Sequence, residues 1–208
     1  GVGQDLAAGY EMDVAYNMND ITVTVNAAFE GEYDDGDPSS DWADAANWLG
    51  DVLPIPTDDV LIDAATVNHT SGTTNVNSVS IEGASVVAVT GGTLTLADTS
   101  RFETSATVSL TGGTLTLNGD LINDATFNHT GGTLNGVGRF FNYDTFTTSG
   151  GTKTYSVDVI NENVMLLQAS TSNLNGNFEN LGVATFDNPL NADGTVTLAN
   201  GGTNYGTI

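Results

Sequence analysis

The feature of the sequence that most constrains the fold is an internal repeat with a period of roughly 20 residues, the lower end of the range seen in repeat proteins. The segment LINDATFNHTGGTLNG (residues 121–136) closely matches LIDAATVNHTSGTTNV (residues 61–76). The pair Phe141-Asn142 repeats Ile122-Asn123 once more, one period further along the chain. A fixed internal period is typical of stacked supersecondary units, each of which buries its apolar face against its neighbours. The chain is therefore expected to form a repeat protein.

Two columns of apolar residues and one series of glycine pairs define the expected coil. The members of each column follow one another at the period of the repeat, and a gap in the first column at Glu179 predicts that one coil slips or opens there. Glycine at a corner permits the positive φ that a sharp change of direction needs. The first column comprises Ile62, Ile81, Phe102, Ile122, Phe141, Ile160 and Leu198; the second comprises Val67, Val87, Val108, Phe127, Phe146, Met165 and Phe186; the corners are Gly91-Gly92, Gly112-Gly113, Gly131-Gly132 and Gly150-Gly151.

These patterns predict an all-β fold, a single-stranded parallel β-helix (β-solenoid) that we expect to be right-handed. Three short strands and their corners make one coil of about 19–21 residues, as expected for a solenoid repeat. About eight such coils fill positions 60–208. Lys153 stands where an inward leucine is expected, so either that strand shifts its register or Tyr155 takes the inner place.

Residues 1–59 are expected to form an N-terminal extension, a strand and an acidic cap. The strand is predicted at residues 21–25, where apolar and polar residues alternate. Trp42 and Trp48, followed by prolines, precede the first coil, and a solenoid needs such a cap because an open end exposes core and strand edge.

The segment NWLGDVLPIPTDDVLID (residues 47–63) resembles the entry motif of secreted bacterial parallel β-helix repeat proteins. In those proteins an Asn-Trp, a glycine, a proline and an Asp-Val-x-Ile run precede the first coil. The segment is also similar to the opening of the eight-glycine module of cell-surface proteins. The resemblance implies a surface or adhesin-like protein, located outside the cell or at the cell surface, and it brings no catalytic residue.

The charge balance excludes two classes of partner. The chain has 26 acidic residues against 3 basic ones, a net charge of −23. Such a field repels nucleic acid and anionic membranes, and no apolar run approaches the ~20 residues of a membrane span. The chain has no cysteine, so neither a disulfide nor a thiolate metal site is available.

A polar series directly follows the first apolar column. Its members are Asp63, Glu82, Glu103, Asn123, Asn142, Asn161 and Asn180. The four asparagines are evenly spaced, which predicts a ladder of stacked amides that hydrogen-bond along the solenoid. The three acids are expected to continue the same column. There they would point to water, bridge calcium, or form a carboxylate pair of the kind that glycosidases use.

The acidic loop at residues 30–44 is the best candidate metal site. Its carboxylates are dense and have few basic partners, which suits calcium, although the spacing does not match an EF-hand. The alternative is a solvated loop without a ligand. The candidate ligands are Asp34, Asp35, Asp37, Asp41 and Asp44.

Two further motifs receive structural interpretations. His69 and His129 stand three coils apart in one column, too far to share a zinc ion. Their NHT triplets, at Asn68 and Asn128, also fit the N-glycosylation acceptor pattern. Thr-x-Thr pairs that follow the glycine corners predict an outer threonine ladder similar to those of ice-binding solenoids; the pairs are Thr93/Thr95, Thr114/Thr116, Thr152/Thr154 and, later, Thr195/Thr197.

No nucleophile–base pair or phosphate loop is recognisable, so we expect a protein that is not an enzyme. The predicted function is that of an extracellular structural subunit of a filament, surface layer or adhesin. The coil pattern stops at Asn204 to Ile208 without a cap, which predicts head-to-tail self-association through the solenoid ends and the N-terminal segment. The alternative is a carbohydrate- or ice-binding module of a larger secreted protein, with glycans as partners.

Overall fold

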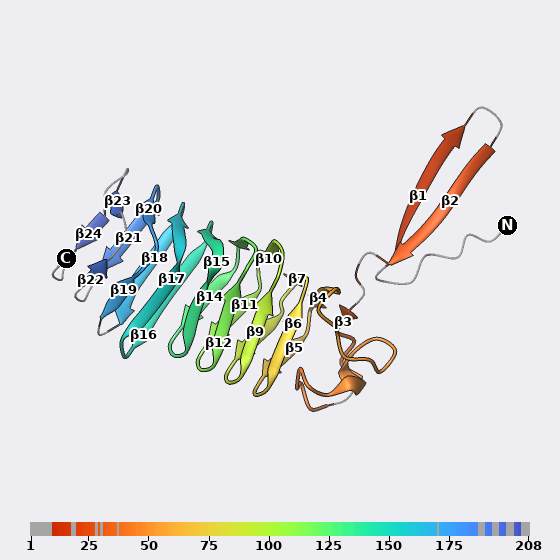
Figure 1. Ribbon diagram of the computed structural model, residues 1–208, viewed down its shortest axis with the longest axis horizontal. Coiled ribbons are helices and arrows are strands. Elements are labelled where there is room, and N and C mark those ends of the chain that lie inside the picture. Colours follow the sequence, from red (N-terminus) through yellow and green to blue (C-terminus); the bar gives the residue numbers. More distant parts are fainter. Residues whose placement is uncertain are drawn as a thin grey trace.

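The computed structural model describes residues 10–17, 20–27, 29, 31–36, 38–169, 171–186, 190–192, 196–198 and 202–204 of the 208 residues. Side chains are described for residues 29, 31–36, 38–168 and 171–185. Nearly all of this chain is β-structure, and the strands stack side by side along one axis (Figure 1). The described part of the chain has one helical turn, the 3-10 helix η1 (Ala45–Asn47).

The stack consists of parallel strands that pair with the corresponding strands of the neighbouring coils, as a β-solenoid requires. One sheet has its strands at successive levels of the stack, one strand from each coil. These strands are β5 (Thr66–His69), β8 (Val86–Val89), β11 (Thr107–Leu110), β14 (Thr126–His129), β16 (Thr145–Gly150), β18 (Val164–Ala169), β21 (Val183–Phe186) and β24 (Gly202–Asn204).

The remaining strands of the stack belong to a second, branched sheet. Its main path is β3 (Gly31–Glu32), β4 (Asp59–Asp63), β7 (Ser78–Glu82), β10 (Ser100–Phe102), β13 (Leu121–Asn123), β15 (Thr133–Asn142), β17 (Lys153–Asn161), β19 (Ser172–Leu174) and β22 (Leu190–Ala192). Its side branches are β6 (Thr73–Val76), β9 (Thr93–Leu96) and β12 (Thr114–Leu117), which join β15, and β20 (Phe178–Asn180) and β23 (Val196–Leu198), which join β17. The predicted parallel β-helix is thereby confirmed.

The N-terminal strands form a separate two-stranded ribbon. β1 (Tyr10–Asn17) pairs with β2 (Asp20–Ala27) in antiparallel register along the whole length of both strands. The predicted strand at residues 21–25 lies inside β2. β1 was not predicted, although its apolar residues alternate from Tyr10 to Tyr16 in the manner of a strand.

Glycine is required by both φ and space at three of the four predicted corners, whereas at Gly150-Gly151 a Cβ on Gly151 would meet nothing within 4 Å. Gly92, Gly113 and Gly132 have φ of 68°, 65° and 76°. A Cβ atom on any of them would lie within 2.3–2.7 Å of the backbone of the preceding corner. Successive corners are therefore in direct contact, and no L-residue side chain fits between them.

The register corrects the first predicted column from the fourth coil onward. Phe102 pairs with Asn123, and Ile122 pairs instead with Arg101. The column thus advances one position further than predicted at this step, and a shift of one residue moves every side chain to the opposite face. The inward column is therefore Ile62, Ile81, Phe102, Asn123, Asn142, Asn161 and Asn180.

Three residues that were expected in the core consequently lie on the outer face. Ile122, Phe141 and Ile160 are only partly buried. Glu179 is also outward and exposed, between the buried Phe178 and Asn180, so no coil slips or opens there. The acids Asp63, Glu82 and Glu103 are not part of the asparagine column, because Glu103 is followed in register by Asp124.

The four asparagines form a buried, hydrogen-bonded ladder, hereafter the asparagine ladder. The Nδ2 atom of Asn123 donates to Oδ1 of Asn142 at 2.8 Å. The same contact is repeated from Asn142 to Asn161 at 2.7 Å and from Asn161 to Asn180 at 2.6 Å. All four side chains are completely buried. Because a buried amide without partners is costly, the ladder fixes the register of these coils.

Each ladder asparagine also closes the corner that follows it. Asn123 Nδ2 donates to the carbonyl of Ala125, and Asn142 Nδ2 donates to the carbonyl of Asp144. In these coils, four positions separate the inward asparagine before the corner from the inward residue of the strand after it, as from Asn123 to Phe127. In the third coil the corresponding separation, from Phe102 to Val108, is longer by two positions. The side-chain bond thus accompanies a shorter corner.

The second column is confirmed over six coils, from Val67 to Met165. Its next member is Ala184, and Phe186 pairs instead with Leu167. In the middle coils the core is aromatic: Phe127 lies 5.7 Å from Phe140 and 5.3 Å from Phe146 between ring centroids. Edge-to-face contacts of this kind contribute about 0.5–1.5 kcal/mol each beyond burial.

The uncertainty at Lys153 is resolved by a register shift. Leu134 pairs with Tyr155, with a shift between Asn135 and Arg139, and the Tyr155 side chain is completely buried. Tyr155 thus takes the inner place, as one of the two predicted alternatives stated. Lys153 is nevertheless buried, with an exposed fraction of 3%.

The cap is built on aromatic side chains, as its sequence predicted. Tyr33, Trp42 and Trp48 are buried, with ring centroids 5.1 Å apart for Tyr33–Trp48 and 4.9 Å for Trp42–Trp48. Trp48 Nε1 donates to the carbonyl of Trp42 at 2.8 Å. These rings belong to the same hydrophobic core as the first coil.

We predict that Asn142→Ala lowers the free energy of unfolding by about 2–5 kcal/mol, because the change leaves buried partners on both neighbouring coils unpaired. The matched control is Asn163→Ala, which removes an exposed bond to the carbonyl of Tyr143 and should cost under ~1 kcal/mol. Urea denaturation followed by circular dichroism measures both. Equal effects of the two variants would contradict a stabilising ladder.

Candidate functional site

The described carboxylates of the acidic loop accept hydrogen bonds from the loop itself. Asp41 Oδ1 accepts from the Ala43 amide at 3.0 Å. Asp44 Oδ1 accepts from the Ala46 amide at 3.1 Å and thereby caps η1, while its Oδ2 accepts from the Ser39 hydroxyl. Asp34 accepts from the Gly36 amide at 3.2 Å. These bonds shape the turns of the loop.

The structure does not group the four described candidates Asp34, Asp35, Asp41 and Asp44 into a metal site. Within the described part of the chain, no three acidic, histidine or cysteine side chains are grouped in a way that could hold a metal ion. Asp35 has φ of 54° and is exposed, and Asp37 lies outside the described residues. Calcium binding at this loop stays a prediction.

A column of carboxylates runs along the outer face beside the asparagine ladder. Asp63, Glu82, Glu103 and Asp124 occupy successive coils. Arg101 joins the last two, with Nε 2.7 Å from Glu103 and Nη2 2.6 Å from Asp124. Since neighbouring strands are ~4.8 Å apart, this arginine relieves the repulsion between adjacent carboxylates.

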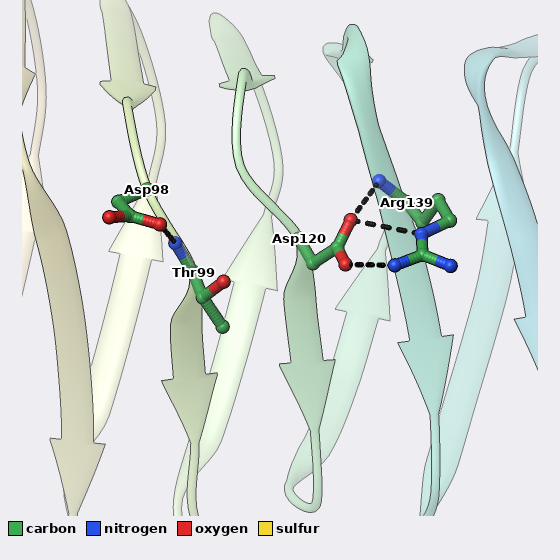
Figure 2. Close-up of polar contacts among 4 residues, drawn as sticks. All are labelled: Asp98, Thr99, Asp120 and Arg139. Atoms are coloured by element: carbon green, nitrogen blue, oxygen red, sulfur yellow. Dashed lines mark hydrogen bonds and ion pairs between the residues drawn. The ribbon is translucent and has the colours of Figure 1, made fainter.

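Arg139 makes the second arginine–carboxylate contact of this face (Figure 2). Its backbone amide and Nε donate to Oδ1 of Asp120 at 3.0 and 3.1 Å, and its Nη2 lies 2.5 Å from Oδ2. The side-chain hydrogen bond from Arg139 lowers the pKa of the Asp120 carboxyl. On the neighbouring coil the Asp98 carboxylate accepts from the Thr99 amide at 2.7 Å. The Arg139–Asp120 contact joins two neighbouring coils, whereas the Asp98–Thr99 bond is local, between consecutive residues; both are exposed.

The outward apolar residues form a patch with these charges, hereafter the Phe141 patch: Ile122, Phe141, Tyr143 and Ile160. The rings of Phe141 and Tyr143 are parallel within 4°, with centroids 6.3 Å apart. The Arg139 guanidinium lies 4.8 Å from the Phe141 centroid. Tyr143 is 40% exposed, and its pKa is raised by partial burial and by nearby Glu162. An aromatic surface with carboxylates and an arginine was not predicted, because Ile122, Phe141 and Ile160 were assigned to the core.

The threonine ladder is in register over part of its expected length. Thr93 and Thr114 pair with each other, as do Thr95 and Thr116. The second row ends at Asn135, whose Oδ1 accepts from the Thr116 hydroxyl at 2.8 Å. Thr154 does not continue it, because the register shift in β15 places Ser156 beside Asn135. Ice binding by this face stays a prediction.

The two histidines lie inside the solenoid, in one column and three coils apart, as expected. His69 is held by the carbonyl of Gly91 at 2.9 Å and the hydroxyl of Thr74 at 3.0 Å. His129 contacts the carbonyl of Gly132 at 3.3 Å, and its Nδ1 atom has no hydrogen-bond partner among the described residues. Burial lowers the pKa of His129 to about 4, and the nearby Lys153 acts in the same direction.

The cap closes two of the three strand edges of the first coil. β3 pairs with β4, and the Trp42 amide donates to the carbonyl of Asn68 in β5. On β6, the residues that the structure describes place β9 along one edge and no strand along the other. A hollow of about 330 Å³ lies beside β6, between residues 71–75 and residues 53–56 with Trp42. The corner of the same coil is open as well, since a Cβ on Gly72 would meet nothing within 4 Å.

The unpaired edge of β6 has defined hydrogen-bonding groups. The carbonyls of Gly72 and Val76 accept from β9 and the residue that follows it. Because backbone groups alternate in direction along a strand, the N–H and C=O of Thr73 and Asn75 point away from β9. Sequence reasoning placed the unprotected edge at the other end of the solenoid and missed this one, because the cap was expected to cover the whole first coil.

In comparisons with known proteins, no family model, curated protein or solved structure matches the chain. The described residues include no helix that is long and apolar enough to cross a membrane.

We predict that stability falls as the pH is lowered from about 6.5 to about 4. The folded pKa of His129 is depressed to about 4, so the unfolded chain binds a proton in this range that the folded chain does not. The stabilisation is complete above the unfolded pKa of ~6.5 and is lost as the pH falls toward the folded value, by up to about 3 kcal/mol.

The variant His129→Val tests this prediction, because valine matches the apolar residue Val89 in the same column. Urea denaturation of both proteins between pH 7 and pH 4 isolates the contribution of His129 from that of the carboxylates. The variant should lose less stability than the unmodified protein over this range. Parallel pH profiles would show that His129 does not contribute.

Proposed function

We propose that this protein is a non-enzymatic structural subunit, outside the cell or at its surface, that associates into a filament, surface layer or adhesin. The observation that carries the proposal is the unpaired edge of β6 at the capped end. Exposed strand edges pair with other chains unless they are covered. Here the cap covers β4 and β5, and the unpaired groups of β6 face a hollow.

The rest of the architecture supports a structural role. The interior is filled by stacked apolar side chains and the asparagine ladder. Where their contacts are described, the carboxylates that were candidates for calcium or for hydrolysis accept from amides or hydroxyl groups or contact arginine. The resemblance of residues 47–63 to entry segments of secreted repeat proteins supports an extracellular location, as does the charge of −23, which screening by salt or calcium would moderate.

We predict that Asn75→Pro weakens self-association without unfolding the solenoid. Proline removes the N–H that points to the open edge, and edge strands accept proline at such positions. The matched control is Asn75→Val, which keeps the N–H. Light scattering and negative-stain electron microscopy over a concentration series, with calcium and with a chelator, measure the association.

The expected result is self-association of the unmodified protein and of Asn75→Val, and loss of most of it in Asn75→Pro with an unchanged circular dichroism spectrum. A monodisperse monomer under all conditions would contradict the proposed function. A calcium requirement would identify the acidic loop as the place to examine next, through the variant Asp35→Asn.

The Phe141 patch favours carbohydrate binding as a second candidate function. Flat aromatic side chains beside carboxylates and an arginine offer both apolar contact and directed hydrogen bonds, the combination that small-molecule sites use. Tyr143 is the most exposed aromatic residue of the patch, and the carboxylates of Asp124 and Glu162 lie near it.

We predict for this second candidate that Tyr143→Ala weakens binding of cellohexaose or mannohexaose at least about fivefold, a loss of ~1 kcal/mol. Titration calorimetry measures the affinity. The control Val183→Ala changes an exposed apolar residue away from the patch and should leave binding unchanged. Absence of binding by the unmodified protein, or equal affinities of the two variants, would count against this function.

A further inference from the structure

The N-terminal ribbon has edges that its own solenoid does not pair in the described structure. β1 and β2 pair only with each other, and their sheet shares no strand with the stack (Figure 1). An isolated two-stranded hairpin is marginally stable in water at best. A further strand along one edge of the ribbon would therefore stabilise it considerably.

The groove beside β6 offers the complementary edge. Thr73 and Asn75 direct one N–H and one C=O each away from β9, so an added strand gains main-chain hydrogen bonds without any change in the solenoid. The open corner at Gly72 lets that strand run past the end of β6. β6 is also short, half the length of β2, so one β2 strand spans the whole edge.

The distribution of charge favours β2 as the strand that occupies the groove beside β6. The chain carries a net charge of −23, so contact between two copies is repulsive over most of the surface. The hollow beside β6 is lined entirely by uncharged residues, namely Trp42, Ala43 and residues 53–56 and 71–75. Residues 21–27 of β2 are also all uncharged. An uncharged strand and an uncharged groove are therefore the places where two such acidic chains can approach most closely.

We infer that β2 of a second copy of this chain pairs along the open edge of β6 and extends the β6-β9-β12 sheet by one strand. The inference rests on the proposed self-association and names the segment and the edge that perform it. The apolar residues of the groove, Leu53 and Ile55, contribute burial in addition to the main-chain bonds; their exposed fractions are 39% and 55%.

Because the chain has no cysteine, an introduced cysteine is the only thiol in a cross-linking test. Two single-cysteine proteins, Thr24→Cys in β2 and Asn75→Cys in β6, are mixed and oxidised mildly, so that a disulfide between them reports only contact between copies. Thr22→Cys and Asn26→Cys replace Thr24→Cys in parallel mixtures to cover alternative registers. The control partner is Val137→Cys, because Val137 is 87% exposed and reacts more readily in random collisions.

The expected result is a disulfide-linked heterodimer of one β2 variant with Asn75→Cys, in an excess on the order of tenfold over the Val137→Cys mixture. The variant Asn75→Pro should also lose most of its self-association, with an unchanged circular dichroism spectrum. Self-association of the chain without preferential cross-linking at Asn75 in any register would overturn the inference and leave the proposed function standing. A strictly monomeric chain would overturn both.

Discussion

The structure depends on one interaction above the others, the stacking of like side chains on successive coils. Each coil pairs its strands with those of its neighbours, so every inward position meets the corresponding position one coil away. Apolar positions satisfy this condition by simple contact. A polar position satisfies it only if each side chain both donates and accepts along the stack. Asparagine meets that demand, and the ladder from Asn123 to Asn180 has one amide-to-amide bond per step.

Much of this architecture could be predicted from the sequence. The period, three of the glycine corners and six members of the second apolar column depend on spacings that repeat without ambiguity, and the cap depends on aromatic residues that precede the first coil. The first column could not be placed correctly, because Ile122-Asn123 offers two candidates for the inward position. Hydrophobicity favours Ile122, but the structure places Asn123 inside, where the amide closes its corner and bonds the next coil.

The candidate sites were harder to predict than the fold for the same reason. A shift of one residue at Ile122 moved an apolar strip from the core to the surface and separated the acidic column from the asparagines. The Phe141 patch therefore had no sequence signal under the expected register. The open edge of β6 could not be anticipated either, because it depends on how far residues 31–58 reach across the first coil. Local sequence patterns specify a coil, whereas the covering of its strand edges by the cap depends on contacts between residues distant in sequence.

The start of the asparagine ladder has a consequence for how the solenoid comes apart. Asn123 Oδ1 is buried and has no hydrogen-bond partner among the described residues, because the preceding coil presents Phe102 at this position. The coils before this junction are joined by apolar contact and have longer corners, whereas those after it are joined by amides. This junction has no amide-to-amide bond and is bridged instead by the Phe102–Phe127 ring contact and the Arg101–Asp124 ion pair. We expect the missing amide bond to weaken the coupling here, so that unfolding that begins at one end of the solenoid pauses between the third and fourth coils.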